Sequence, residues 1–203
     1  MAILTQENAM SGYTAKQAEE DTLSMLKVWV WSGFRSESEA ADMLEDHLSE
    51  EDALTDPDAI RKALAAVFKT KAAAEKSWPK ETDCDRLDRA FDALMAAGIC
   101  ALHNAGYTQS DGHADVAQEL QDQGRAKFHG SCFYHGQDVE RAVHGDGLLI
   151  AFGDLDDDQA RSEAVGREVC AALNAAGFAT VWDGTHKTRI DIPKIVWRRR
   201  SPQ

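Results

Sequence analysis

The chain has 203 residues, enough for one domain or for one domain with a helical extension. Hydrophobic residues make up 43% and charged residues 28%, and no stretch approaches the roughly 20 apolar residues of a membrane-spanning helix. The net charge of −13, from 35 acidic and 22 basic residues, repels nucleic-acid backbones and anionic membranes, so we expect neither as a partner.

Capping signals predict four helices in the first half of the chain. Ser36 and Glu39 have the spacing of a capping box. Pro57 follows Asp56, as a proline at the first helical position follows its N-cap. Gly98 ends the last of these helices. The expected helices are 15–31, 36–47, 57–76 and 84–97.

After Gly98 the periodicity changes from helical to strand-like. Strands are expected at 99–103, 128–135, 148–152, 178–182 and 188–197, and helices at 113–123, 137–143 and 158–176. Asp183 and Gly184 are a hairpin signal between the last two strands. This order is typical of split βαβ units, whose helices cover one face of a largely antiparallel sheet. We therefore expect an α+β protein, with a helical segment, 1–98, packed on a ferredoxin-like sheet segment, 99–203.

The cysteines argue against a metal site. Cys100 and His103, like Cys132 and His135, have the C-x-x-H spacing that structural zinc sites use. Side chains three residues apart in a strand point to opposite faces, so neither pair can bind one ion. The chain also begins without a basic region followed by an apolar core, which predicts a cytoplasmic location with reduced cysteines. We expect no metal and no cofactor.

Acidic residues concentrate in two stretches, 45–58 and 154–158. Asp154 begins a run that resembles a calcium loop, but Gln159 and Val165 stand where such a loop needs glycine and glutamate. Acidic residues ahead of a helix are explained by its dipole. Because exposed charges mainly accelerate association, we expect these stretches to steer a basic protein partner.

Aromatic and polar side chains near the expected strand ends have the composition of a ligand pocket, which is mostly apolar with few polar groups. The candidate ligand-binding residues are Tyr134, Gln137, Asp138, Trp182, Asp183 and His186. Cys132, His135 and Asp138 have the residue types of a nucleophile, a base and an orienting acid. Strand alternation separates Cys132 from His135, so we assign no catalytic residue.

Three stretches carry a family resemblance. They are SWPKETDCDRLDRAFDALMAAGICA at 77–101, FYHGQDVERAVHGDGLLIAFG at 133–153, and ALNAAGFATVWDGTHKTRIDIPKIVWRRR near the end. Together they resemble the bacterial family known as domain of unknown function 6891. The likeness covers most of the chain from about residue 20 onward. It implies a shared domain but no chemistry, because the family has no assigned function.

Two functions fit these observations. The first is a non-enzymatic interaction or regulatory module that binds a basic protein partner. The second is a small-molecule-binding or hydrolytic enzyme that uses the aromatic and acidic cluster around Tyr134, Asp138 and Asp183. A deep pocket with convergent polar groups would favour the second, and a flat apolar patch ringed by carboxylates the first. We favour the first and leave the oligomeric state open.

Overall fold

The structure, a computed structural model, describes residues 15–50 and 56–202. These residues form two compact units. One contains the described residues up to Lys76 together with Ser201 and Pro202, and the other is Ser77–Arg200. The boundary therefore follows Lys76, whereas the sequence placed it after Gly98. Within the described ranges, no helix is long and apolar enough to cross a membrane.

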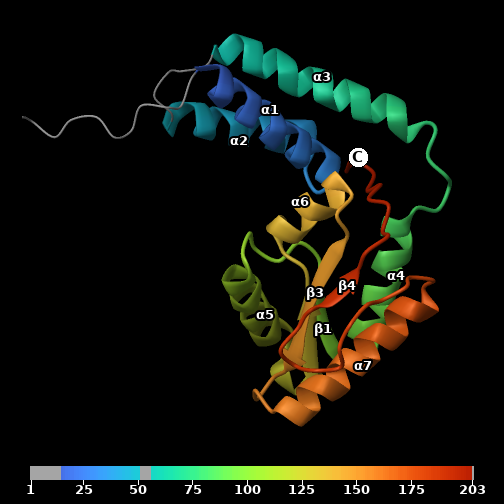
Figure 1. The fold of residues 1–203 in the computed structure, drawn as a ribbon. Helices are drawn as coiled ribbons and strands as arrows, with labels where there is room; N and C mark the ends of the chain where they lie inside the picture. Colours follow the sequence, from blue (N-terminus) through green and yellow to red (C-terminus); the bar gives the residue numbers. More distant parts are fainter. Residues whose placement is uncertain (1–14, 51–55, 203) are drawn as a thin grey trace, which may run out of the picture. The chain divides into compact units, whose positions relative to one another are not determined.

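The first unit contains three helices, α1 (Ala15–Ser32), α2 (Glu37–Glu50) and α3 (Pro57–Glu75), which confirms the first three expected helices (Figure 1). The side chain of Asp56 caps α3 by accepting a hydrogen bond from the Asp58 N–H at 3.0 Å. The apolar faces of the helices share one core, formed by Leu26, Val30, Ala40, Leu44, Ile60, Leu64 and Phe68.

The second unit is described throughout. Its elements are α4 (Asp83–Ala96), β1 (Ile99–Leu102), α5 (Gln109–Gln123), the 3₁₀ helix η1 (Arg125–Lys127), β2 (Gly130–Phe133), α6 (Gly136–His144), β3 (Leu148–Asp154), α7 (Gln159–Ala175) and β4 (Ile190–Ile192). α4 was assigned to the helical segment but belongs to this unit, because it packs against β1 and α7. Its N-cap is Thr82, since Thr82 Oγ1 accepts the N–H of Asp85.

The strands pair in the order β1-β2-β3-β4. β1 and β2 are parallel, whereas β2–β3 and β3–β4 are antiparallel. A parallel pair needs a crossover connection, and α5 lies on the connection from β1 to β2. The α+β class is thus confirmed with a mixed sheet, and the ferredoxin-like topology is not established.

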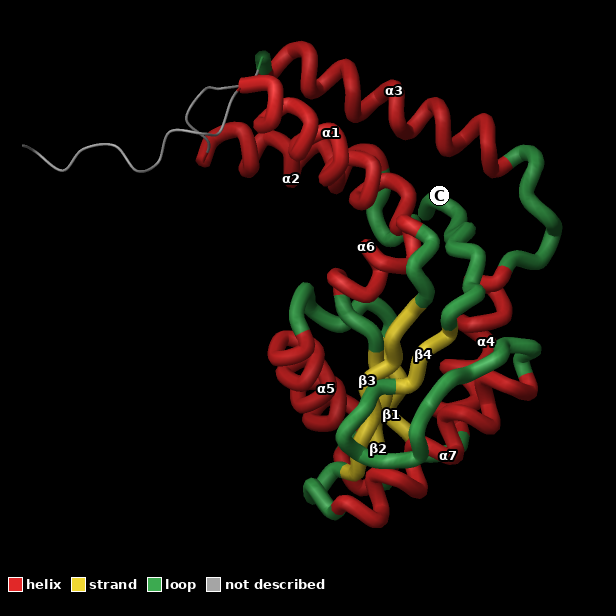
Figure 2. Tube along the Cα trace, viewed as in Figure 1, coloured by secondary structure: helices red, strands yellow, loops and turns green. Residues whose placement is uncertain are grey.

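Helices cover both faces of this sheet, which corrects the expectation of one covered face (Figures 1 and 2). α4 and α7 pack together on one face, and α5 lies on the other. Cys100 and Phe133 share a core with Val116 and Leu120 of α5. The residues that alternate with them point toward α4 and α7. A parallel pair covered on both faces is buried on both, so its sequence does not alternate between apolar and polar residues.

The C-terminal segment contains less strand than predicted. Residues 178–182 are not a strand: Val181 alone forms a bridge, with Asp191, through two hydrogen bonds of 2.9 Å. The last strand, β4, has three residues, and Pro193 follows it at once. Proline cannot donate to a ladder, which explains the early end of β4.

Candidate functional site

Titratable side chains gather at the carboxyl ends of the parallel strands β1 and β2. His103 follows β1, and Tyr134 and His135 follow β2. In open sheets with parallel strands, ligands bind beyond these ends of the strands. The two histidines lie in different surroundings.

His103 lies against α4. Its ring stacks on Phe91 at a centroid distance of 4.4 Å, and its Nδ1 is 2.8 Å from the hydroxyl of Tyr134. Burial lowers the pKa of His103 to about 4, although the charge of Asp88, 3.6 Å from Nε2, opposes this change. His103 is therefore neutral near pH 7. It serves as the hydrogen-bond partner of a fully buried phenol.

His135 belongs to a buried cluster with Asp138 of α6 and Arg189, which precedes β4. Asp138 is 1% exposed, and its two oxygens accept hydrogen bonds from Arg189 Nη1 at 2.9 and 3.0 Å. The same Nη1 lies 3.1 Å from His135 Nε2. Burial lowers the pKa of His135, against the opposing charge of Asp138. His135 Nε2 also lies 3.1 Å from Asp138 Oδ2, so the imidazole contacts both members of the buried ion pair.

A cavity of about 730 Å³ lies beside this cluster, on the α5 side of the sheet. Its floor consists of side chains that share one face of β2 and β3 by strand alternation: Ser131, Leu149, Ala151 and Gly153. Its walls come from the N-terminal ends of α5 and α7 and from residues 186–189. Arg189 is part of this wall, so it connects the buried Asp138 to the cavity.

Three of the predicted ligand-binding residues lie around α6, in different surroundings. Tyr134 is fully buried, and its ring packs edge-on against those of Phe91 and Trp197. Asp138 is joined to the cavity through Arg189, as described above. Gln137 is exposed.

The other three predicted residues lie in the loop before β4. Trp182 donates its Nε1–H to the Thr185 carbonyl at 3.0 Å and packs edge-on against Phe152. Asp183 accepts hydrogen bonds from Thr188 Oγ1 and the Thr185 N–H, which lower its pKa and shape the loop. Of the three, His186 lines the cavity.

A second charged feature lies on the outer side of α5. This helix has no lysine or arginine and carries four carboxylates: Asp111, Asp115, Glu119 and Asp122. At about 100° per residue, the four fall within about 80° of arc, to one side of the buried Val116 and Leu120. None of them forms an ion pair with a residue that the structure describes. We call these four residues the α5 acidic flank.

The acidic stretch 154–158 differs, because arginines of the same chain pair with two of its four aspartates. Asp156 pairs with Arg125 and Arg161, and Arg161 Nε lies 3.2 Å from Asp154. Asp158 caps α7 by accepting the N–H of Arg161 at 2.9 Å. The field of this stretch is therefore weaker than its composition predicts.

The stretch 45–58 lies in the first unit, and its residues 51–55 fall outside the described ranges. Glu45 accepts hydrogen bonds from Arg61 Nε and Nη2, each at 2.7 Å, and Asp58 accepts from Nη1 at 2.9 Å. Here too, an arginine of the same chain partly neutralises the acidic stretch.

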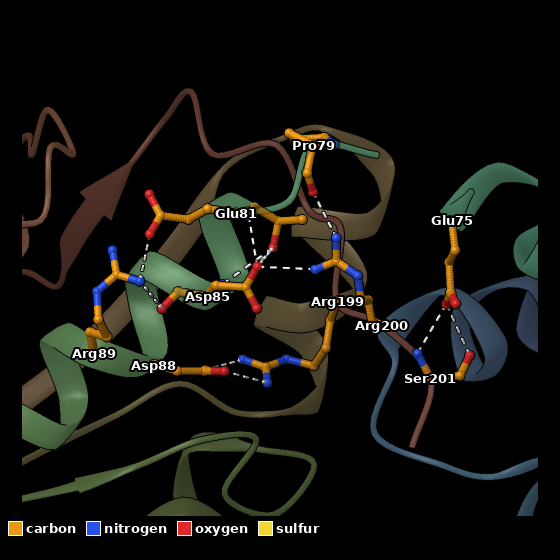
Figure 3. Close-up of polar contacts among 10 residues, drawn as sticks. Glu75, Pro79, Glu81, Asp85, Asp88, Arg89, Arg199, Arg200 and Ser201 are labelled. Carbon is orange, nitrogen blue, oxygen red and sulfur yellow. Dashed lines mark hydrogen bonds and ion pairs between the residues drawn. The ribbon is translucent and has the colours of Figure 1, made fainter. Parts of the chain in front are cut away.

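Two arginines near the C-terminus pair with two carboxylates of α4 (Figure 3). Arg199 forms two hydrogen bonds with Asp88. Arg200 donates to Asp85 at 3.1 Å and to the Pro79 carbonyl at 2.7 Å. These contacts hold the end of the second unit against α4.

The chain matches a family described as a domain of unknown function, DUF6891, over residues 15–201. It belongs to this family. The match confirms the resemblance carried by the three sequence stretches. No curated protein and no solved structure matches the chain.

The two C-x-x-H pairs do not converge on a shared position. Cys100 packs in the core beneath α5, whereas His103 stacks on Phe91 of α4. Across the described part of the chain, no three His, Cys, Asp or Glu side chains are grouped as a metal ion would require.

Neither Arg189 nor the α5 acidic flank was predicted from the sequence. The flank had a visible signal, since Asp111, Asp115 and Glu119 recur at intervals of four. The predicted helix began at 113, however, and so excluded Asp111. Arg189 had no local signal, because it is 51 residues from its partner Asp138.

Proposed function

We propose that this protein is a non-enzymatic interaction module that binds a basic protein partner through the α5 acidic flank. The observation that carries the proposal is a helix with four carboxylates, no cation of its own and no ion pair to another described residue. Two aspartates of the stretch 154–158 and three of α4 pair with arginines of the same chain. A cationic side chain of a partner therefore gains more electrostatic stabilisation at the α5 acidic flank than at these paired carboxylates.

Repulsion within the flank supports a role in binding. Asp115 and Glu119 are four residues apart on α5. Like charges at this spacing destabilise a helix by about 0.2–0.5 kcal/mol, and a bound cationic side chain relieves that repulsion. Exposed charges act over about 8 Å at physiological salt and mainly raise the association rate. We therefore expect the affinity for a basic partner to fall as salt rises.

The test compares two triple variants that remove the same charge from different places. D115N/E119Q/D122N neutralises the flank but keeps Asp111, which forms the capping box of α5 with Thr108. D156N/D157N/D158N is the matched control, and asparagine retains the ability to cap α7. Association with an immobilised arginine-rich peptide is measured by surface plasmon resonance at low and high salt.

We expect the flank variant to associate about tenfold more slowly at low salt, and the control to stay close to the parent protein. Equal slowing in both variants would mean that only net charge matters, and the proposal would fail. Salt-independent association of the parent protein would also contradict it.

A second candidate function, the binding or hydrolysis of a small molecule, is supported by the cavity beside Arg189. Its volume of about 730 Å³ lies in the usual range for ligand pockets, roughly 300–1,000 Å³. Of the three residues expected to carry this function, Asp138 is linked to the cavity through Arg189. Tyr134 is buried among aromatic rings, and Asp183 shapes its own loop. The arrangement therefore favours binding over hydrolysis.

A further inference from the structure

The charges around the cavity over β3 differ from those around a second hollow of about 660 Å³ in the same unit. In that second hollow, Arg125 and Arg161 face Asp156, and His129 faces Glu168 at 3.2 Å. An anion that entered it would have to displace these carboxylates. The cavity over β3, by contrast, is lined by Arg189 and Lys187, which keep N–H donors that no described carboxylate accepts.

Arg189 uses one nitrogen of its guanidinium within the protein. Every hydrogen bond that it makes to a described residue comes from Nη1. Its Nε and Nη2, which form a parallel pair of donors, have no partner among those residues. Arg61 uses the same pair to bind both oxygens of Glu45, each at 2.7 Å. The unused edge of Arg189 therefore matches a carboxylate or a phosphate.

The floor of the cavity adds a neutral donor and room for the body of a ligand. Ser131 is 8% exposed, and its hydroxyl forms no hydrogen bond within the described ranges. Leu149 and Ala151 supply apolar surface. Gly153 leaves space, since a Cβ at this position would meet only Ser162 Oγ within 4 Å, at 3.9 Å.

Two carboxylates line the cavity: Asp157, which is exposed, and Asp154, which is engaged within the chain. The side chain of Asp154 is 5% exposed and accepts hydrogen bonds from the N–H groups of Asp156 and Asp158. Lys187 lines the cavity, is exposed, and pairs with no acidic residue that the structure describes. It adds a positive charge where an anion would enter.

We propose that this cavity binds a small organic oxyanion. Its carboxylate or phosphate group accepts hydrogen bonds from Arg189 Nε and Nη2 and from the Ser131 hydroxyl, and its body packs on Leu149 and Ala151. The proposal rests on the second candidate function and names its ligand class. The chain's net charge of −13 opposes the approach of anions, so binding depends on this local set of donors.

Ligand-detected NMR and calorimetry on the full chain test the proposal. The probes are benzoate, butyrate and methyl phosphate, with benzamide and butyramide as neutral counterparts of the two carboxylates. We expect the anions to bind, and each amide to bind at least about tenfold more weakly than its carboxylate, because the amide cannot accept a charge-assisted pair of hydrogen bonds. The comparison of carboxylates with methyl phosphate identifies the preferred head group.

Two variants locate the site. Arg189→Lys keeps a positive charge beside Asp138 but lacks the planar pair of donors, so we expect benzoate to bind at least about tenfold more weakly. Gly153→Leu fills the floor without altering Arg189 and should weaken binding in the same way, which keeps the test decisive if Arg189→Lys fails to fold. The matched control is Lys194→Gln, which removes a lysine outside this cavity and should bind like the parent.

Each contrary result has its own meaning. Equal affinity for benzoate and benzamide, with both weakened by Gly153→Leu, would overturn the oxyanion class and leave small-molecule binding standing. Benzoate binding that is unchanged in Arg189→Lys and Gly153→Leu would overturn the site. Failure of all five probes to bind at about 10 mM would overturn both the proposal and the second candidate function.

Discussion

Carboxylates in two regions of the second unit lie in opposite surroundings. Asp138, near the start of α6, is 1% exposed and accepts two hydrogen bonds from Arg189. Asp115, on α5, is exposed and pairs with no cation that the structure describes. The two helices follow neighbouring strands, α5 after β1 and α6 after β2. What distinguishes the two carboxylates is whether a cation of the same chain lies beside them. A carboxylate with such a cation stabilises the fold, and one without it is available to a partner.

The largest expected effect is the loss of the buried carboxylate. Asp138→Ala removes both carboxylate acceptors of Arg189 Nη1 and the group that accepts the backbone N–H of His135. Breaking a buried pair by removing one partner is strongly destabilising, so we expect the free energy of unfolding to fall by about 3 kcal/mol. Urea denaturation measures this change.

The exposed aspartate, Asp115, provides the control for the Asp138→Ala experiment. Asp115→Ala should change the free energy of unfolding by less than about 0.5 kcal/mol. A double-mutant cycle with Arg189→Ala should show strong coupling to Asp138, because the two side chains are in direct contact. Additive effects in that cycle, or equal losses in the two aspartate variants, would break the comparison.

The second expected effect is a pH dependence of stability caused by the buried ring of His103. The pKa of His103 lies at about 4 in the folded chain, below its ordinary 6.5, because the ring is buried. Between these two values the unfolded chain binds more protons, so the free energy of unfolding falls as the pH is lowered. A loss on the order of 1–3 kcal/mol is expected by pH 4, allowing for the partial exposure of the ring. The lowered pKa of His135 adds to the same slope.

The slope is measured by urea denaturation at pH 7, 5.5 and about 4, in the parent chain and in His103→Gln. Removal of the titrating ring should flatten part of the slope, and the remainder is assigned to His135 and other groups. An identical slope in the two proteins would show that the pKa of His103 is not lowered in the folded chain. NMR titration of its ring gives an independent value.

The smallest expected effect is on the α5 acidic flank itself. Glu119→Gln removes one of two like charges four residues apart, and should raise the free energy of unfolding by about 0.3 kcal/mol. The gain should shrink at high salt, because Asp115 is exposed and Glu119 only partly buried, so salt screens the pair. Glu119 accepts a hydrogen bond from Gln123 Nε2, which the oxygen of a glutamine at position 119 can also accept. A loss of stability would therefore contradict repulsion within the flank.

Much of the fold was predictable because its signals are local. The capping residue Asp56, Pro57 and the apolar periodicity of α3 lie within one segment, so the helix could be placed without knowledge of its neighbours. The strands 99–103 and 148–152 were likewise recognisable as short apolar runs. The predicted strand 178–182 failed because a strand exists only where a partner pairs with it, and Val181 alone forms a bridge.

The candidate site was predictable only in part. His186 and Asp138 were recognised by residue type, but the group that joins Asp138 to the cavity, Arg189, was not. The cavity floor was also missed, because Ser131 and Gly153 have no distinctive local pattern. They share a floor only through the antiparallel register of β2 and β3, in which Ser131 lies opposite Gly153.

By itself, the sequence determined the helices, the change from helical to strand periodicity after Gly98, the net charge of −13 and the family resemblance. Each of these depends on residues close together in the chain, or on composition. Tertiary structure alone decided that β1 and β2 are parallel, that helices cover both faces of the sheet, and which carboxylates are neutralised. The physical reason is that a carboxylate's role depends on the nearest cation, and Arg189 lies 51 residues from Asp138 and Arg125 31 residues from Asp156.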